Sequence, residues 1–362
     1  MTLDNYAEPT QETVGAFRRI AEDLWRRLRP ATPRKAAIYE TLWEIDTDVR
    51  DRVVSLPDYG PVGTRLDNLL APWIADKSPE ETTQLLVYPP GNDGRFLREW
   101  AEDRTLTILD PPDLETSGRE LPKSVESLAQ SGTVVIPALQ HWFVRKVGGM
   151  DMVRAMLVRV CESENRVILG CESWAWQYLI KSIDAHHLLP EAKVVQALTA
   201  DEIRAWFADM VEGASLGADV KFRSARDGSD IFAKDSGYFR QLALESIGIP
   251  WVAWAIWRRS LFTTKRDELS DSVWVRHPTT PDPPETDERE ASLILHALLV
   301  HGGLPPGWMR EVLPLVGADT VIAMLQRKDL VEIREDRLHI TPEAYPSIKI
   351  MLEDASYPGD GL

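Results

Sequence analysis

The stretch LLVYPPGNDGRF, residues 85–96, indicates the architecture expected for this chain. Its apolar run stops at a Pro-Pro-Gly turn, and the helical pattern RFLREWAED begins at Arg95. A strand that turns sharply into a helix gathers backbone N–H groups at the corner, where they can bind an anion such as phosphate. The stretch therefore predicts a strand, a glycine-containing loop and a helix.

Short apolar runs alternate with helical patterns on both sides of this corner. The apolar runs lie at residues 84–88, 105–109, 133–136, 166–170 and 192–198. Helical spacing occupies residues 95–103, 122–130, 150–163 and 173–183. Strands that alternate with helices predict right-handed crossovers and a parallel sheet covered on both faces. We expect an α/β core at residues 81–200.

Helical patterns flank the expected core. Apolar stripes at residues 14–28 and 38–53, together with a short helix at 65–74, predict a helical N-terminal region over residues 1–80. Residues 201–274 read as a helical, lid-like subdomain with a turn at RSARDGSD. The proline-rich, acidic segment 275–288 is typical of a stiff linker.

The last region, residues 289–362, has a different pattern. Three helical segments at 289–301, 307–315 and 319–328 precede LVEIR and RLHIT, which flank the turn EDR as the strands of a hairpin would. Three helices followed by a hairpin is the order of a winged-helix domain. We expect one here.

Composition is that of a folded protein with an acidic surface. The 362 residues are 44% hydrophobic and 27% charged, with 41 basic and 57 acidic residues and a net charge of -16. Such a charge repels nucleic acid and anionic lipid outside a local basic patch. No apolar run approaches the roughly 20 residues that span a bilayer. The sequence predicts a cytoplasmic protein without membrane insertion, and its two cysteines indicate neither a disulfide framework nor a zinc site.

The order of elements resembles the P-loop NTPases, specifically the AAA+ and STAND (ASCE) branch in which a winged helix follows the nucleotide domain. A working P-loop reads G-x-x-x-x-G-K-[ST], where Lys neutralises phosphate and the hydroxyl binds magnesium. The positions of this motif carry Gly91, Asn92, Asp93, Gly94, Arg95 and Phe96. The resemblance implies a vestigial nucleotide-binding loop, because Phe96 cannot bind magnesium and Asp93 would repel phosphate.

The other positions carried over from the family have also lost their usual groups. The second ATPase motif ends a strand with an Asp and a Glu that serve magnesium and water, whereas TVVIPALQ has Ala138 and Gln140 there. In VILGCESW, Glu172 or Ser173 would fill the sensor position, while Ser173 could equally cap a helix. The GIP at 248–250 resembles a STAND motif and makes Arg258 a sensor-like cation, although a packed helix start explains it too.

DNA contact is the least favoured role for the expected winged helix. Residues 285–362 hold seven basic and fourteen acidic residues, a balance of 7 - 14 = -7. The small basic patch that could contact DNA consists of Arg327, Lys328, Arg334 and Arg337. Docking within the chain, or contact with a protein partner or a second copy in a homo-oligomer, is the better expectation.

These observations lead to one main hypothesis and two alternatives. The main hypothesis is a catalytically degenerate P-loop ATPase-like protein, a pseudo-ATPase that serves as an interaction scaffold or weak nucleotide sensor; it has no catalytic residue and no metal site. ATP is a possible cofactor, without a strong magnesium site. The first alternative is an active AAA+/STAND-type regulatory switch in which Asp110 or Glu172 supplies the missing carboxylate. The second is a winged-helix transcriptional regulator.

Overall fold

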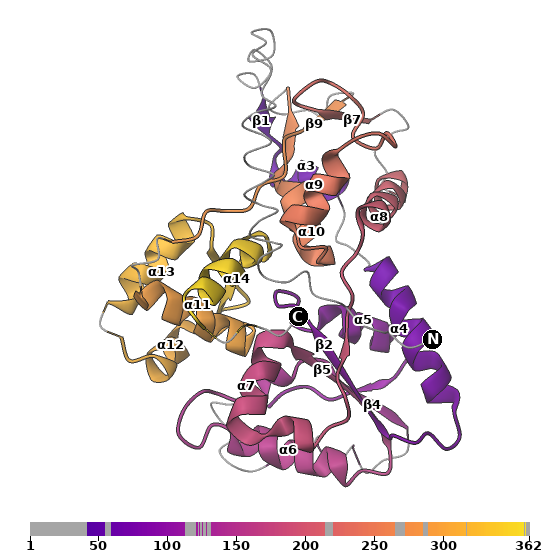
Figure 1. The fold of residues 1–362 in the computed structure, drawn as a ribbon, viewed down its shortest axis with the longest axis vertical. Helices are drawn as coiled ribbons and strands as arrows, with labels where there is room; N and C mark the ends of the chain where they lie inside the picture. The colour runs from indigo at the N-terminus through magenta and orange to yellow at the C-terminus, as the bar shows by residue number, and fades with distance from the viewer. Residues whose placement is uncertain are drawn as a thin grey trace.

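The fold is taken from a computed structural model of the chain. It describes residues 42–54, 59–112, 132–213, 220–264, 272–284, 289–315 and 317–357, with residues 121, 123, 125, 128 and 359. Figure 1 shows three groups of elements: a lower α/β core, an upper unit, and a C-terminal unit beside them. Within the described ranges, no helix combines the length and the apolar content needed to cross a membrane.

The core contains a five-stranded, all-parallel sheet in the order β3-β4-β5-β2-β6. Its strands are β2 (Thr83–Tyr88), β3 (Thr107–Ile108), β4 (Thr133–Ile136), β5 (Arg166–Glu172) and β6 (Lys193–Val194). Its helices are α4 (Gly60–Ala75), α5 (Arg95–Asp103), α6 (Asp151–Cys161) and α7 (Ser173–Ile183), with short 3₁₀ turns η2 (Leu139–His141) and η3 (Ala185–His187). The expected α/β core is therefore confirmed, including the strand, loop and helix at 85–96.

The two faces of the sheet bury different helices. Leu86 and Tyr88 of β2 lie in one apolar cluster with α4 and α5, whereas Leu85 and Val87 lie in a second cluster with α6 and α7. This alternation follows from the two-residue period of a strand. Because both faces are covered, β2 is buried along its whole length. The core is therefore an α/β fold in which a parallel sheet has helices on both faces.

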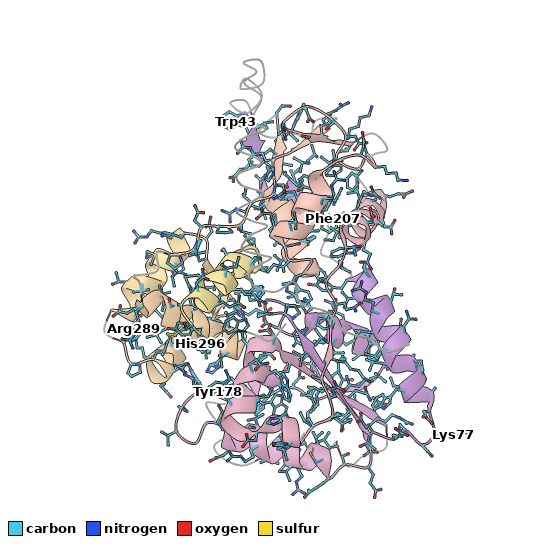
Figure 2. All side chains as sticks on the ribbon, in the orientation of Figure 1. Trp43, Lys77, Tyr178, Phe207, Arg289 and His296 are labelled. Carbon is cyan, nitrogen blue, oxygen red and sulfur yellow. The ribbon has the colours of Figure 1, made fainter. Side chains whose placement is uncertain are left out.

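The upper unit differs from the helical subdomain predicted for residues 201–274. Its helices α8 (Ala200–Gly213), α9 (Tyr238–Glu245) and α10 (Pro250–Arg259) accompany a four-stranded sheet in the order β1-β8-β9-β7. The strands are β1 (Trp43–Glu44), β7 (Lys221–Ser224), β8 (Leu261–Thr263) and β9 (Ser272–Val275). They are too short to produce a clear alternating pattern, so the sheet was missed. Figure 2 places Trp43 and Phe207 in this unit.

The prediction for the first 80 residues is confirmed only in part. Helix α4 includes the expected helix at 65–74, and α3 (Thr47–Val53) occupies the end of the stripe predicted at 38–53. The earlier part of that stripe is wrong at Trp43 and Glu44, which pair with β8 instead of forming a helix turn. The helix predicted at 14–28 lies outside the described residues, as does most of the helix predicted at 122–130.

The C-terminal unit has the element order expected of a winged helix. Helices α11 (Arg289–His301), α12 (Pro306–Val312) and α13 (Ala318–Arg327) precede the antiparallel hairpin of β10 (Val331–Arg334) and β11 (Arg337–Ile340). A turn, η4 (Pro342–Ala344), and an additional helix that the sequence pattern did not indicate, α14 (Tyr345–Asp354), follow. Helix α11 contacts α7 of the core, and Figure 2 labels Tyr178 and His296 on the two sides of this border.

Candidate functional site: a carboxyl pair in the loop after β2

Three strand ends meet at one corner of the core sheet. The loop at 89–94 follows β2, residues 137–140 follow β4, and Glu172 is the last residue of β5. Adjacent parallel strands bring their carboxyl ends to one edge, which is where ligand sites of α/β sheets lie. Gly91, Asp93 and Gly94 have positive φ angles of 96°, 54° and 72°. The loop therefore curls tightly, with its N–H groups turned inward.

The Glu172 carboxyl group occupies the inside of this loop. The backbone N–H groups of Gly91 and Asp93 donate to Glu172 Oε1 at 3.1 and 3.2 Å. Glu172 itself is 0% exposed. The backbone N–H of Glu172 donates to Gln140 Oε1 at 3.2 Å. Gln140, in the segment that follows β4, therefore helps to position Glu172 at the end of β5. A side chain of the protein thus takes the place at which such a loop would bind an anion.

Close packing holds the loop in this shape. Tyr88 Oη donates to the carbonyl of Pro137 at 2.9 Å, and a Cβ added to Gly94 would lie 2.4 Å from that same oxygen. From the upper unit, Trp251 Nε1 donates to the carbonyl of Pro90 at 2.7 Å and the Trp251 ring stacks on Phe96. Only a glycine fits at position 94, because both its positive φ and its neighbour exclude a side chain.

Asp93 connects the loop to the C-terminal unit. Arg334 Nη2 at the end of β10 donates to Asp93 Oδ2 at 2.9 Å. His141 Nε2 lies 3.8 Å from Oδ1, and His339 Nδ1 lies 3.6 Å from Oδ2. Arg337 donates to the carbonyl of Gly303 at 2.7 Å and to His141 Nδ1 at 3.3 Å. The β10–β11 hairpin therefore lies directly over the loop.

The two carboxyl groups share a poorly solvated space. Burial, followed by the charge of Asp93, raises the pKa of Glu172 to about 8, although the loop N–H groups act in the opposite direction. Burial also raises the pKa of Asp93, opposed chiefly by Arg334 and Arg337. Because Asp93 holds a direct ion pair, Glu172 is the member that carries the proton at neutral pH.

A small cavity separates the pair from the C-terminal unit. It measures about 20 Å³. Its lining consists of Pro90, Gly91 and Asp93 of the loop, Glu172, Leu298, Leu299, Gly302, Gly303, His339, Ile340, Pro342 and Tyr345. Asp93 Oδ1 and Glu172 Oε2 are buried without a hydrogen-bond partner, and both lie 3.2 Å from the point that a Cβ on Gly302 would occupy. This volume holds about one water molecule. It is far too small for a nucleotide.

Four histidines surround the same border, of which His301 and His339 are buried and His141 and His296 are partly buried. Burial is the largest cause that lowers the pKa of each: well below its usual value for His141, to about 3 for His301 and His339, and to about 4 for His296. Nearby arginines lower these values further, and the Arg145 N–H donates to His301 Nε2 at 3.2 Å. Neutral imidazoles are therefore built into the contact between the core and the C-terminal unit.

The residues predicted for the site divide into two groups. Gly91, Asp93, Gly94, Gln140 and Glu172 converge on one corner, and the Asn92 side-chain oxygen accepts the Phe96 N–H at 2.9 Å. Ala138 and Ser173 are buried in the segments that follow β4 and β5, and Phe96 packs against Tyr88 and Trp251. Arg95 is exposed.

Arg258 does not reach this corner. Its guanidinium pairs with Asp51 and lies over the Trp254 ring, so the fold does not bring this predicted sensor-like residue to the loop. The GIP sequence begins helix α10 at Pro250, as the packing interpretation of this motif predicted. Asp110, the proposed replacement carboxylate, pairs with Arg98 at an exposed site. Glu172 is the sensor-position residue that the fold brings to the loop.

Sequence reasoning missed the partners that come from distant segments. His141, His339 and the turn at Gly302 gave no recognisable motif, and only the Gly-Gly pair at 302–303 indicated a tight approach. Arg334 and Arg337, proposed for DNA, instead face the core, whereas Arg327 and Lys328 are exposed. Among the described residues, no group of three or more His, Cys, Asp or Glu side chains is placed to hold a metal ion.

Comparisons with known proteins add little to this geometry. A scan of protein-family models and a search of curated proteins gave no match. Among solved structures, the ORC2 protein of Aeropyrum pernix, in ADPNP-ADP complexes, is 13% identical to this chain and matches it with a TM-score of 0.33. The match covers 82% of this chain and 94% of the ORC2 chain. Cdc6p from Pyrobaculum aerophilum is 13% identical with a TM-score of 0.29, covering 86% and 99%. At such low TM-scores these likenesses say nothing about a site or an activity.

Proposed function

We propose that this protein is a catalytically degenerate P-loop ATPase-like protein that serves as an interaction scaffold. The observation that carries the proposal is the occupation of the loop by its own Glu172. The N–H groups of Gly91 and Asp93 donate to that carboxyl group, which is fully buried. A phosphate could enter only if Glu172 left and the wing moved away.

The groups that phosphoryl transfer requires are missing from the same corner. Transfer depends on a cation over the terminal phosphates, a hydroxyl and a carboxylate on magnesium, and a group that orients water. Arg95 is exposed at the position of the cation, and Phe96 is buried in an aromatic cluster at the position of the hydroxyl. Gln140, at the second motif, is engaged by the backbone of Glu172. These substitutions support a scaffold rather than an ATPase.

The C-terminal unit supports the proposal because it is docked on the loop. Tyr345 accepts a hydrogen bond from Trp174 Nε1 at 3.2 Å, and Lys146 pairs with Glu311 at 2.8 Å across the same border. Arg334 and Arg337, half of the basic patch considered for DNA, are used in this contact. We therefore propose a cytoplasmic protein whose partner is another protein or a second copy of itself.

Steady-state ATP hydrolysis tests this proposal. The purified chain with ATP and magnesium is expected to show no turnover above a no-protein blank, and Arg95→Ala is expected to leave that result unchanged. Glu172→Ala, which empties the loop, serves as the matched variant, and it too lacks the groups for hydrolysis. Magnesium-dependent turnover by the native chain that disappears in Arg95→Ala would overturn the proposal and support an active switch.

A further inference from the structure

Two buried carboxyl oxygens face one small cavity between the core and the C-terminal unit. Glu172 Oε2 and Asp93 Oδ1 have no hydrogen-bond partner among the described residues, and both line the cavity of about 20 Å³. Glu172 is 0% exposed. Buried polar atoms without partners are rare, because each one loses its hydration without replacement. We therefore expect an arrangement that gives both oxygens a hydrogen-bond partner.

The contacts of each carboxyl group indicate which oxygen carries a proton. Glu172 Oε1 accepts two backbone N–H groups and so cannot be the hydroxyl oxygen that points into the cavity. Asp93 Oδ2 accepts Arg334, which keeps Asp93 ionised. The remaining arrangement places a proton on Glu172 Oε2, the oxygen that shares the cavity with Asp93 Oδ1.

We propose that this single proton is a latch: while Glu172 is protonated, the turn at 302–304 and the β10–β11 hairpin stay closed over the loop, and loss of the proton to solvent releases them. Two ionised carboxylates in one buried space repel each other and demand hydration. Glu172 has no exposed surface, so water can reach its carboxyl group only if the cover moves. The cover is the turn that contains Gly302 and Gly303, which lies against both carboxyl oxygens and against the His339 ring.

Other charged and titratable groups around the pair affect the pH at which Glu172 loses its proton. They are Tyr88 on β2, Arg95 and Arg98 on α5, His141 on η2, Cys171 on β5, His301 on α11, Arg334 on β10, and Arg337 and His339 on β11. Of these, Arg334 and Arg337 favour ionised Asp93. Burial raises the pKa of Tyr88 and Cys171 and lowers those of the three histidines, so all five are neutral around neutral pH. The Glu172 proton is the one that leaves first as pH rises.

The segments that would open are joined to the core by only a few polar contacts near the cavity. Leu304 and Leu338 exchange backbone hydrogen bonds of 3.0 and 2.7 Å, which tie the turn to the hairpin. Arg337 to Gly303 also ties the hairpin to the turn, whereas Arg334 to Asp93 and Arg337 to His141 Nδ1 join the hairpin to the core. Leu304, Val331, Leu338 and Ile340 of the turn and hairpin belong to the first apolar cluster, so local opening would expose their amides and disturb one side of that cluster. None of these residues belongs to the second cluster, which would stay in place.

Amide hydrogen exchange of the full chain between pH 7 and pH 9 tests the latch. Protection, corrected for the intrinsic rate at each pH, is expected to fall about tenfold for peptides covering 302–304 and 331–340, because ionisation of one group with a pKa near 8 changes the closing equilibrium by that factor. Peptides from the apolar core of β2 are expected to change much less. Constant protection of the turn and hairpin across this range would overturn the proposal.

Three variants make the test specific. Glu172→Gln cannot ionise and is expected to keep its protection at pH 9. Asp93→Asn, which leaves one carboxyl group, is expected to move the fall to a lower pH because the charge of Asp93 raises the pKa of Glu172. Glu311→Gln removes an exposed acid from the same border and should retain the native behaviour. The same fall in Glu172→Gln as in the native chain would also contradict the latch. This inference does not depend on the absence of ATP turnover.

Discussion

Asp93 in the loop after β2 and Arg334 at the end of β10 form an ion pair of 2.9 Å across 241 positions of sequence. The loop after β2 thereby binds the β10–β11 hairpin of the same chain. Its inner face is filled by Glu172 and its outer face by Arg334, so one short segment is enclosed by parts of the chain that follow it.

Removing the Asp93–Arg334 pair is expected to destabilise the fold modestly. The side chains are 26% and 33% exposed, so solvent screens part of the attraction, and a double-mutant cycle with Asp93→Asn and Arg334→Gln should give a coupling of about 1 kcal/mol in urea unfolding. The pair Arg310–Asp319, equally short at 2.9 Å but 72% and 76% exposed, is the control and should give no measurable coupling. Equal coupling in the two pairs would contradict this assignment.

The free energy of unfolding is expected to decrease as pH rises from 6.5 to 8.5. The pKa of Glu172 is raised from 4.5 to about 8 in the folded protein, so in this window the folded state holds a proton that the unfolded state has lost. The unfolded state binds fewer protons, so the free energy of unfolding falls by about 2 kcal/mol between pH 6.5 and pH 8.5. The histidines are neutral in both states over most of this window. Denaturant unfolding of Glu172→Gln, which has no proton to lose, should show little of this decrease.

Acid is expected to destabilise the protein through its buried histidines. The pKa of His301 is lowered from 6.5 to about 3 in the folded protein. Below pH 6.5 the unfolded state therefore binds a proton that the folded state does not bind, and the free energy of unfolding decreases as pH falls. Between pH 6.5 and pH 5, this group alone contributes a loss of about 2 kcal/mol. His301→Gln should show a correspondingly smaller loss in urea unfolding, whereas His187→Gln, at an exposed position, should behave as the native chain does.

Glycine at position 302 is expected to be required by both its conformation and its neighbours. Its φ is +59°, and an added Cβ would lie 2.8 Å from Gln140 Cγ and 3.2 Å from both carboxyl oxygens. Gly228 has a similar φ of +73° with nothing within 4 Å, so Gly228→Ala reports the backbone strain alone, about 1 kcal/mol. Gly302→Ala should cost about 1 to 3 kcal/mol more in thermal or urea unfolding. A loss no larger than that of Gly228→Ala would show that the turn does not press on the carboxyl pair.

The sequence predicted the core well because its pattern is local. The strand at 84–88, the loop and the helix that begins at Arg95 follow from apolar runs, glycines and helical spacing that neighbours in sequence define. The hairpin at 331–340 followed for the same reason. The sheet of the upper unit was missed because β1 joins β8 across more than two hundred residues, and two- to four-residue strands have no period to detect.

The site was predicted only as far as one segment could show it. The altered residues at 91–96 were visible, but the group that fills the loop could not be identified, because its contact depends on the order of strands in the sheet. Glu172 was considered as a sensor, whereas the fold directs its carboxyl group to the N–H groups of Gly91 and Asp93. The inward-facing Arg334 likewise depends on how the C-terminal unit docks.

Titration calorimetry of the native chain with ATP, in the presence and absence of magnesium, tests the central claim most directly. With the loop filled by Glu172, we expect no saturable heat at ligand concentrations up to about 1 mM, the weak end of specific binding. Saturable binding in the micromolar range that weakens in Gly94→Ala, a substitution that disrupts the loop, would show that the carboxyl group gives way to phosphate and would contradict the account.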